Sequence, residues 1–96
     1  MKVEIKPSTR KDKKYMAIFT DDEGKKVKTT FFGSAGMSDF TKHKDEARKK
    51  LYLDRHRKRE NWNDYMSAGA LSRWILWNLP TLKASIADYK KRFKLK

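Results

Sequence analysis

Residues 14–32 read KYMAIFTDDEGKKVKTTFF, two β-prone runs on either side of a turn signal. The first run, residues 14–20, is apolar on both faces, and the second, residues 25–32, ends in two phenylalanines. The four residues between them end in Gly24, which can adopt the positive φ that tight turns require. This pattern predicts a β-hairpin over residues 14–32.

The hairpin side chains divide between two faces if Thr20 pairs with Lys25, and a bulge would shift that register. One face then carries Met16, Ile18, Val27 and Phe31, and the other carries Tyr15, Phe19, Lys26, Lys28 and Phe32. Aromatic rings beside lysines resemble a stacking platform for bases. Alternatively, a helix covers the rings and the lysines extend past it into solvent. Only 38% of the residues are hydrophobic, so the core needs these rings, which favours the second interpretation.

Further elements are expected on both sides of the hairpin. Val3-Glu4-Ile5 alternates apolar and polar residues before Pro7, which is typical of a short edge strand over residues 3–6. The stretch 33–36, GSAG, ends the sheet. Apolar spacing predicts helices at about 41–59, 68–78 and 81–94. Their expected N-caps are Ser38 or Thr41, then Ser67, then Thr81.

Each predicted helix has an apolar face. The first helix has a narrow stripe of Phe40, Ala47 and Leu51, extended by the stem of Arg55. The second has Leu71, Trp74, Ile75 and Asn78 on one face, with Leu76 and Trp77 beside it, so we expect burial on two sides. The third has a seam of Leu82, Ile86, Tyr89 and Phe93. We therefore expect one α+β domain over residues 1–96, with residues 1–13 forming a partly mobile basic segment.

Charge is the main clue to function. Twenty-five Lys and Arg oppose twelve Asp and Glu, which gives a formal net charge of +13 and a pI near 10.1. The excess lies in residues 1–14, 41–60 and 83–96, whereas residues 15–40 and 61–82 are close to neutral and hold most of the bulky apolar side chains. The near-neutral stretches are therefore the expected core. The basic stretches are the expected surface for a polyanion.

Composition also excludes several classes of protein. The chain has no Cys, which excludes disulfides and thiolate zinc sites. The longest fully apolar run, residues 74–77, is far shorter than the ~20 residues of a membrane span. Residues 1–6 contain no apolar signal-peptide core. We expect a non-secreted, intracellular protein, or one packaged in a particle.

The stretch from Asn61 onward has an unusual aromatic block. It begins with Asn61-Trp62-Asn63-Asp64, continues as Ala68-Gly69-Ala70-Leu71-Ser72-Arg73-Trp74-Ile75-Leu76-Trp77-Asn78, and ends in Pro80-Thr81. With a lead-in of Gly36, Ser38, Asp39, Phe40, Thr41 and His43-Lys44-Asp45, the chain resembles an uncharacterised family of small basic proteins of large nucleocytoplasmic DNA viruses over about residues 14–93. The resemblance implies a virus-encoded protein carried in the particle, in the viral factory or in the host nucleus. It implies no catalytic residues.

Candidate contacts to nucleic acid come from the three basic stretches and the aromatic block. Those predicted to neutralise phosphates are Lys11, Lys13, Lys14, Lys44, Arg48, Arg55, Arg57, Lys58, Arg59, Arg73, Lys90, Lys91, Arg92 and Lys94. The alternative is that each helix simply has a solvated charged face. Trp74 and Trp77 fit core packing better than base stacking. For Trp62, in a polar loop, stacking and packing are equally compatible with the sequence. Arg73 either reaches a phosphate or covers Trp77 by cation–π contact.

Catalytic signals are weak. His43 and His56 are thirteen residues apart without further ligand spacing, so no metal site is predicted. Asp54-Arg55-His56 before Asn63, and Glu23-Gly24-Lys25, each echo one element of a metal-dependent nuclease. Turn chemistry explains Glu23-Gly24-Lys25. The motif that begins at Asp54 lacks the second metal-binding histidine that such a nuclease would have. Asn61 and Asn63 are more typical of turn hydrogen bonds than of base contacts.

We therefore expect a non-enzymatic protein without cofactor or metal that binds nucleic acid, DNA rather than RNA. Binding would use the phosphate backbone and have little sequence specificity. The alternative is a virion structural protein whose basic surface binds an acidic partner protein.

Overall fold

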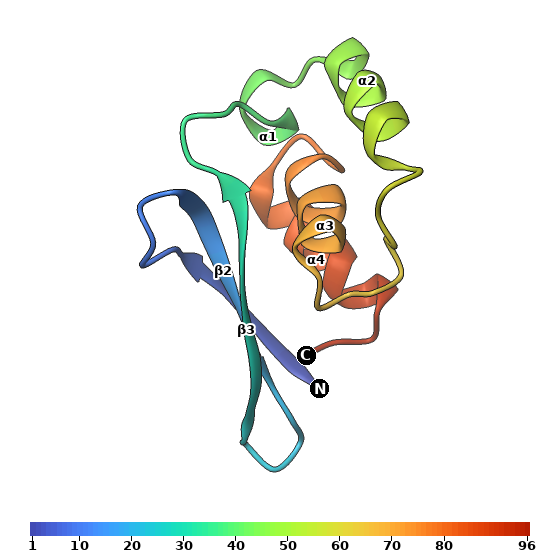
Figure 1. The fold of residues 1–96 in the computed structure, drawn as a ribbon. Coiled ribbons are helices and arrows are strands. Elements are labelled where there is room, and N and C mark those ends of the chain that lie inside the picture. The colour runs from blue at the N-terminus through green and yellow to red at the C-terminus, as the bar shows by residue number, and fades with distance from the viewer.

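The structure is a computed structural model that describes residues 1–96. One layer of the fold is a three-stranded antiparallel sheet. Its strands are β1 (Lys2–Pro7), β2 (Lys13–Thr20) and β3 (Lys26–Ser34), in the order β1-β2-β3. The predicted hairpin and edge strand are therefore confirmed. Figure 1 shows the two termini side by side, where backbone hydrogen bonds join Lys96 to Met1 and to Val3.

The hairpin register differs from the predicted one by a bulge. Thr20 pairs with Lys26 rather than Lys25, and the irregularity lies between Phe19 and Thr20. In the turn, the Asp21 carboxylate accepts hydrogen bonds from the backbone N–H groups of Glu23 and Lys25. These bonds are ordinary turn chemistry for an aspartate.

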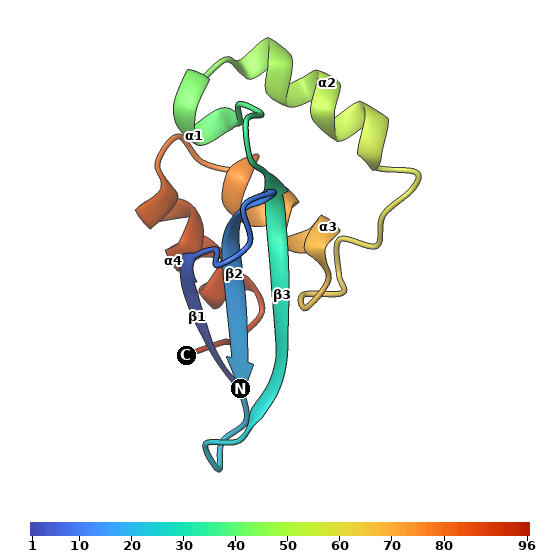
Figure 2. The same cartoon turned by 60° about the vertical axis from the view of Figure 1, so that its left-hand side comes forward.

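The inner face of the sheet carries the aromatic rings. Phe19 and Phe32 are 0% and 1% exposed and pack against the helices. The second interpretation of this face, a helix covering the rings, is the correct one. The opposite face, with Met16, Ile18 and Phe31, has no helix over it (Figure 2).

The predicted α+β architecture is confirmed, but the stretch predicted as one helix over about 41–59 forms two helices. These are α1 (Phe40–His43) and α2 (Glu46–His56), separated by Lys44 at φ 53°. Neither Ser38 nor Thr41 caps the first helix. Asp39 accepts the N–H of Thr41, and Asp45 accepts the N–H groups of Ala47 and Arg48. The cap at Asp45 competes with a continuous helix through that position.

This break also overturns the predicted apolar stripe. Phe40 is buried, but Leu51 is 56% exposed, and no residue of α2 is buried. Ala47 and Arg55 are exposed as well. Because α2 begins anew at Glu46, its faces do not continue those of α1. Tyr52 instead points toward the body of the protein.

The remaining helices form the second layer. They are α3 (Ala68–Leu71), which continues as the π-helical turn η1 (Ser72–Leu76), and α4 (Leu82–Arg92). Ser67 and Thr81 cap them as predicted, through hydrogen bonds from the N–H groups of Ala70 and Ala84. The core contains Val3, Ala17, Phe19, Phe32, Leu71, Ile75, Leu76, Tyr89 and Leu95. Trp74, Trp77 and the rest of the predicted α4 seam pack against it half-buried.

None of these helices has the length and apolar character needed to span a membrane.

Candidate nucleic-acid interface

A column of four aromatic side chains attaches α2 to the protein. The Tyr52 ring lies parallel to the Trp77 indole, with centroids 4.3 Å apart and an interplanar angle of 4°. His56 stacks on Tyr52 at 4.2 Å, and His43 lies 5.4 Å from Trp77. The column joins α1, α2 and the end of η1. A further contact is the hydrogen bond from Lys49 Nζ to the carbonyl of Asn78, at 2.7 Å.

Glu60 closes the turn that follows α2. Its carboxylate lies 3.0 Å from His56 Nδ1 and accepts the indole N–H of Trp62 at 3.2 Å. Burial, and then the negative charge of Glu60, raise the pKa of Tyr52 to about 12. The phenol of Tyr52 therefore stays protonated, and the column is uncharged at this ring near neutral pH.

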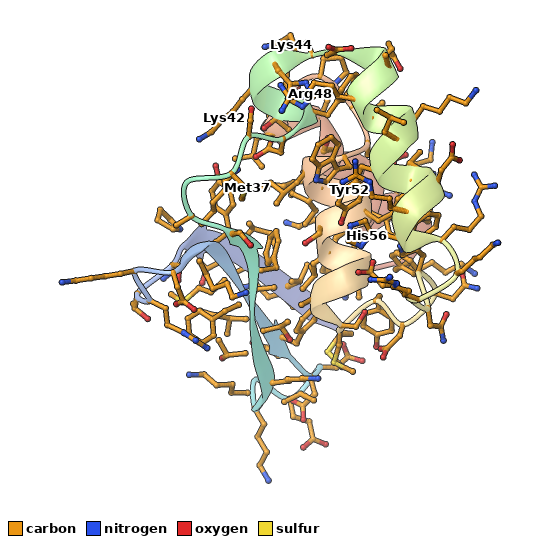
Figure 3. The ribbon with its side chains drawn as sticks, turned by 45° about the horizontal axis from the view of Figure 1, so that its top comes forward. Met37, Lys42, Lys44, Arg48, Tyr52 and His56 are labelled. Carbon is orange, nitrogen blue, oxygen red and sulfur yellow. The ribbon has the colours of Figure 1, made fainter.

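A cleft of about 490 Å³ lies beside the aromatic column. Its walls come from the end of β3 and the loop after it, from α2, and from α3 with η1. Figure 3 shows Met37 on the loop side of this opening, opposite Tyr52 and His56 on α2. The volume lies within the range of small-ligand sites in proteins, about 300–1,000 Å³.

The cleft combines positive charge with apolar surface. Lys13, Arg48 and Arg55 line it without an ion pair to the rest of the chain. Two of its apolar residues, Met37 and Leu51, are 66% and 56% exposed. Large apolar side chains exposed beside a concave surface mark a place where a ligand or partner can pack.

Lys14 also lines the cleft, but its charge is used within the fold. Its Nζ lies 2.6 Å from Asp39 Oδ2, and the two side chains are only 10% and 2% exposed. Asp39 in addition accepts hydrogen bonds from the N–H and the hydroxyl of Thr41. A buried, satisfied pair of this kind ties β2 to the start of α1 and leaves no charge for a ligand.

Arginine and tryptophan side chains form a second cluster, near the C-terminal ends of α2 and α4. The Arg73 guanidinium lies 4.1 Å from the ring centroid of Trp74 and 5.2 Å from that of Trp62. Arg92 lies 3.8 Å from the centroid of Trp74, and its guanidinium is 3.4 Å from Asp88. The Trp74 indole N–H donates to the backbone carbonyl of Trp62 at 2.9 Å. Trp62 is thus half-buried and held in this cluster.

Arg73 is the half-buried centre of the cluster. Its guanidinium donates to the carbonyl of Trp77 at 3.1 Å, and its Nε is buried without a partner. Burial, followed by the positive charge of Arg92, lowers the pKa of Arg73, and Arg57 also contributes. Positive charges from the basic stretches 41–60 and 83–96 therefore both act on Arg73. Arg73 was predicted to contact either a phosphate or the ring of Trp77. A cation–π contact is present, but it is with Trp74 and Trp62.

A protein-family model, described as a family of unknown function (DUF5754), matches residues 3–56, which are 54 of the 96 residues. The chain belongs to this family. The matched segment contains the sheet except for Lys2, together with α1 and α2, so it includes the α2 wall of the cleft and ends before the tryptophans. No curated protein and no solved structure matches the chain.

The predicted basic residues separate into engaged and unengaged groups. Lys14, Arg73 and Arg92 have the internal contacts described above, Arg57 lies 3.9 Å from Asp54, and Lys44 donates to the carbonyl of Thr41 at 3.4 Å. The side chains without a hydrogen bond or ion pair are Lys11, Lys13, Arg48, Arg55, Lys58, Arg59, Lys90, Lys91 and Lys94. The fold brings Lys13, Arg48 and Arg55 together at the cleft.

Three residues that give the cleft its character were not predicted as site residues: Met37 and Tyr52 were not singled out, and Leu51 was assigned to an apolar core stripe. A signal was present, because Arg48, Leu51, Tyr52 and Arg55 follow i, i+3, i+4, i+7 spacing and share one face of a helix. A helix face that mixes two arginines with an aliphatic and an aromatic residue is unsuited to a dry core. It suits contact with an anionic, partly apolar ligand.

The residues of the weak catalytic signals lie apart from any ligand set. No group of three or more His, Cys, Asp or Glu side chains is placed to hold a metal ion. His43 Nδ1 accepts the N–H of Asp45 at 2.9 Å, and His56 belongs to the aromatic column. The Asn61 side chain accepts the N–H of Asn63 at 3.0 Å, a turn hydrogen bond as predicted.

Proposed function

We propose that this protein binds nucleic acid without catalysing a reaction, DNA rather than RNA, through the phosphate backbone and with little sequence specificity. The proposed binding surface is the α2 cation set, defined as Arg48, Lys50, Arg55, Lys58 and Arg59 on α2 and the turn after it.

One observation carries the proposal: the fold does not use the charges of the α2 cation set, although it does use that of Lys49 on the same helix. None of the five side chains of the α2 cation set makes a hydrogen bond or an ion pair, and all five are exposed. The helix buries no residue, so these cations are not present to cover a hydrophobic contact. Figure 3 shows Lys42, Lys44 and Arg48 gathered where α1 meets α2, which adds positive charge at that end.

The electrostatics of this surface favour a polyanion over small counterions. Like charges close together on one short helix repel each other, and a phosphate backbone relieves that repulsion while it releases condensed counterions. The helix also has few acids of its own, and Asp45 serves as its N-cap. The net charge of +13 adds a long-range attraction for polyanions to the local attraction at α2.

The test is a charge reversal matched by a control elsewhere. Arg55→Glu, Lys58→Glu and Arg59→Glu together should weaken binding to a mixed-sequence DNA duplex by at least tenfold at 50 mM salt. Lys25→Glu, Lys26→Glu and Lys28→Glu change the net charge equally, but at exposed positions in the β2–β3 turn and the start of β3. Circular dichroism checks that both triple variants fold. Equal weakening by the two variants would contradict a surface on α2.

The biological role follows from the resemblance to proteins of large DNA viruses. We propose that the protein neutralises or organises a viral genome, within the virion, the viral factory or the host nucleus. The choice of DNA over RNA rests on the same resemblance. Detection of the protein in purified particles, bound to the genome, is the corresponding experiment.

A second candidate function is a virion interaction protein that binds an acidic partner. The basic surface would bind the acidic partner, and the uncovered face of the sheet would add an apolar contact, since Val27 is 48% exposed and Arg10 lies over Phe31 at 5.4 Å. A partner complex that persists in 1 M salt and is lost in Val27→Glu would support this function over the first.

A further inference from the structure

We propose that the cleft beside α2 is a binding site for an unpaired base, so that the protein prefers single-stranded to double-stranded nucleic acid. This inference rests on the proposed function and specifies the form of nucleic acid that the α2 surface takes. The proposed base enters the cleft between Met37 and Leu51 while its flanking phosphates lie against the cations at the rim.

The cleft has the volume and composition for such a ligand. Its volume of about 490 Å³ accommodates a group of the size of a nucleotide. Its apolar lining includes the exposed Met37 and Leu51 at the mouth and the buried Leu76 deeper in. Polar side chains that can form hydrogen bonds to a base, Ser38 and Ser72 among them, line the same space.

Charge at the cleft complements an anion. The lining contains Lys13, Lys14, Arg48 and Arg55 against the carboxylates of Asp39 and Glu60. Asp39 is paired with Lys14, and Glu60 is bound to His56 and Trp62, so three cations remain without a partner. Arg48 and Arg55 are two helical turns apart, about 10 Å along the axis of α2. They are thus placed to contact phosphates on both sides of one inserted base.

The cleft is also continuous with the proposed phosphate-binding surface. Arg48 and Arg55 belong both to the α2 cation set and to the cleft lining. A strand that follows α2 therefore passes the cleft mouth. In a duplex the bases are paired and stacked, and they cannot enter a cleft without being unpaired at a cost of a few kcal/mol. Single strands pay no such cost.

An acidic peptide with an apolar anchor would meet the same charge and the same apolar surface. One feature favours a nucleic acid. The cations at the α2 wall are arginines, whose planar guanidinium groups bind phosphate through paired hydrogen bonds and stack on bases. Tyr52 and Trp77 line the site as well, but their faces are stacked on each other and on His56, so they contribute apolar ring edges to the cleft.

The experiment compares three ligands of equal length: a mixed-sequence single strand, the same strand with abasic sites, and the duplex. The abasic strand keeps every phosphate but has no base to insert. Wild-type protein should bind the intact strand about tenfold more tightly than the abasic strand. Leu51→Ala and Ala68→Trp should each remove most of this difference. Ala68 is exposed and lines the cleft, so the indole fills the space without a change in charge.

Val27→Ala is the matched control, because Val27 is 48% exposed, compared with 56% for Leu51, and lies outside the cleft. It should retain the wild-type ratio. Two independent cleft variants guard against loss of folding in either one.

The outcomes separate the two proposals. Equal, salt-dependent binding of all three ligands would overturn the cleft inference and leave the proposed function standing. Absence of binding to all three would overturn both. Tighter binding of a glutamate- and leucine-rich peptide than of the intact strand, reduced by Leu51→Ala, would assign the cleft to a protein partner and overturn the inference.

Discussion

The ring of Tyr52 lies flat on the indole of Trp77, 4.3 Å away and within 4° of parallel. Because no residue of α2 is buried, this stack is the main packing contact of the helix. It joins two parts of the chain that are 25 residues apart. The helix that carries the proposed binding surface is therefore held by a small number of side chains.

Tyr52→Ala should detach α2 more than it destabilises the whole fold. We expect a loss of about 2 kcal/mol in unfolding free energy, less than for a fully buried ring. Hydrogen exchange should accelerate strongly at α2 amides and only weakly in the sheet. Tyr52→Phe keeps the stack and serves as the control. Uniform acceleration across the sheet and α2 would contradict a separately attached helix.

Stability should fall in alkaline solution because of the same residue. The pKa of Tyr52 is about 12 in the folded protein, compared with 10.0 for an unperturbed tyrosine. Between these two pH values the Tyr52 phenol loses its proton in the unfolded chain but keeps it in the folded protein. The contribution of Tyr52 to the free energy of unfolding is therefore complete below pH 10 and is lost as the pH rises to about 12. The loss is on the order of 2 kcal/mol. Tyr52→Phe should show a smaller decrease in urea unfolding free energy from pH 9 to pH 12, and an equal decrease would count against the assignment.

The Lys14–Asp39 ion pair should be important for stability and unimportant for binding. Asp39→Ala leaves a buried ammonium group without a partner and should cost about 3–5 kcal/mol. Asp12→Ala breaks an exposed pair with Arg10, in which the side chains are 55% and 60% exposed, and should cost less than about 1 kcal/mol. Thermal or urea unfolding gives both values. Similar costs for the two variants would be inconsistent with a buried pair.

Gly33 should tolerate substitution less well than Gly36. Both have positive φ, +77° and +86°, so alanine is strained by about 1 kcal/mol at either position. At Gly33 a Cβ would also lie 2.7 Å from Leu76 Cδ1, in the core between β3 and η1. We expect Gly33→Ala to cost about 1–3 kcal/mol more than Gly36→Ala, which meets open space. Denaturation midpoints that coincide for the two variants would contradict this packing.

The sheet and α4 could be predicted because their signals are local. Alternation, a turn with glycine and a helical seam of Ile86 and Tyr89 each lie within a short stretch of chain. The break between α1 and α2 was missed although Asp39 and Asp45 are both good N-caps. The long run of charged, helix-forming residues favoured one continuous helix, so the sequence did not indicate that Asp45 begins a second one.

The site was predictable only in part, because charge is visible in a sequence and pairing is not. Arg48 and Arg55 were identified because positive charge is concentrated in residues 41–60. Lys14 was assigned to binding because its partner, Asp39, is 25 residues away and no local pattern links them. The cleft could not be predicted either, since it depends on how α2 lies against the β3–α1 loop.

Salt dependence of DNA affinity tests the central claim most directly. The measurement is the dissociation constant of wild-type protein with a mixed-sequence duplex between 50 and 200 mM salt. Contacts from most of the five residues of the α2 cation set predict a linear plot of log K against log salt, with a slope between about −3 and −5. The Arg55→Glu, Lys58→Glu, Arg59→Glu variant should show a slope reduced by about 2 to 3. A flat plot, or no binding at 50 mM salt, would contradict nucleic-acid binding by this surface.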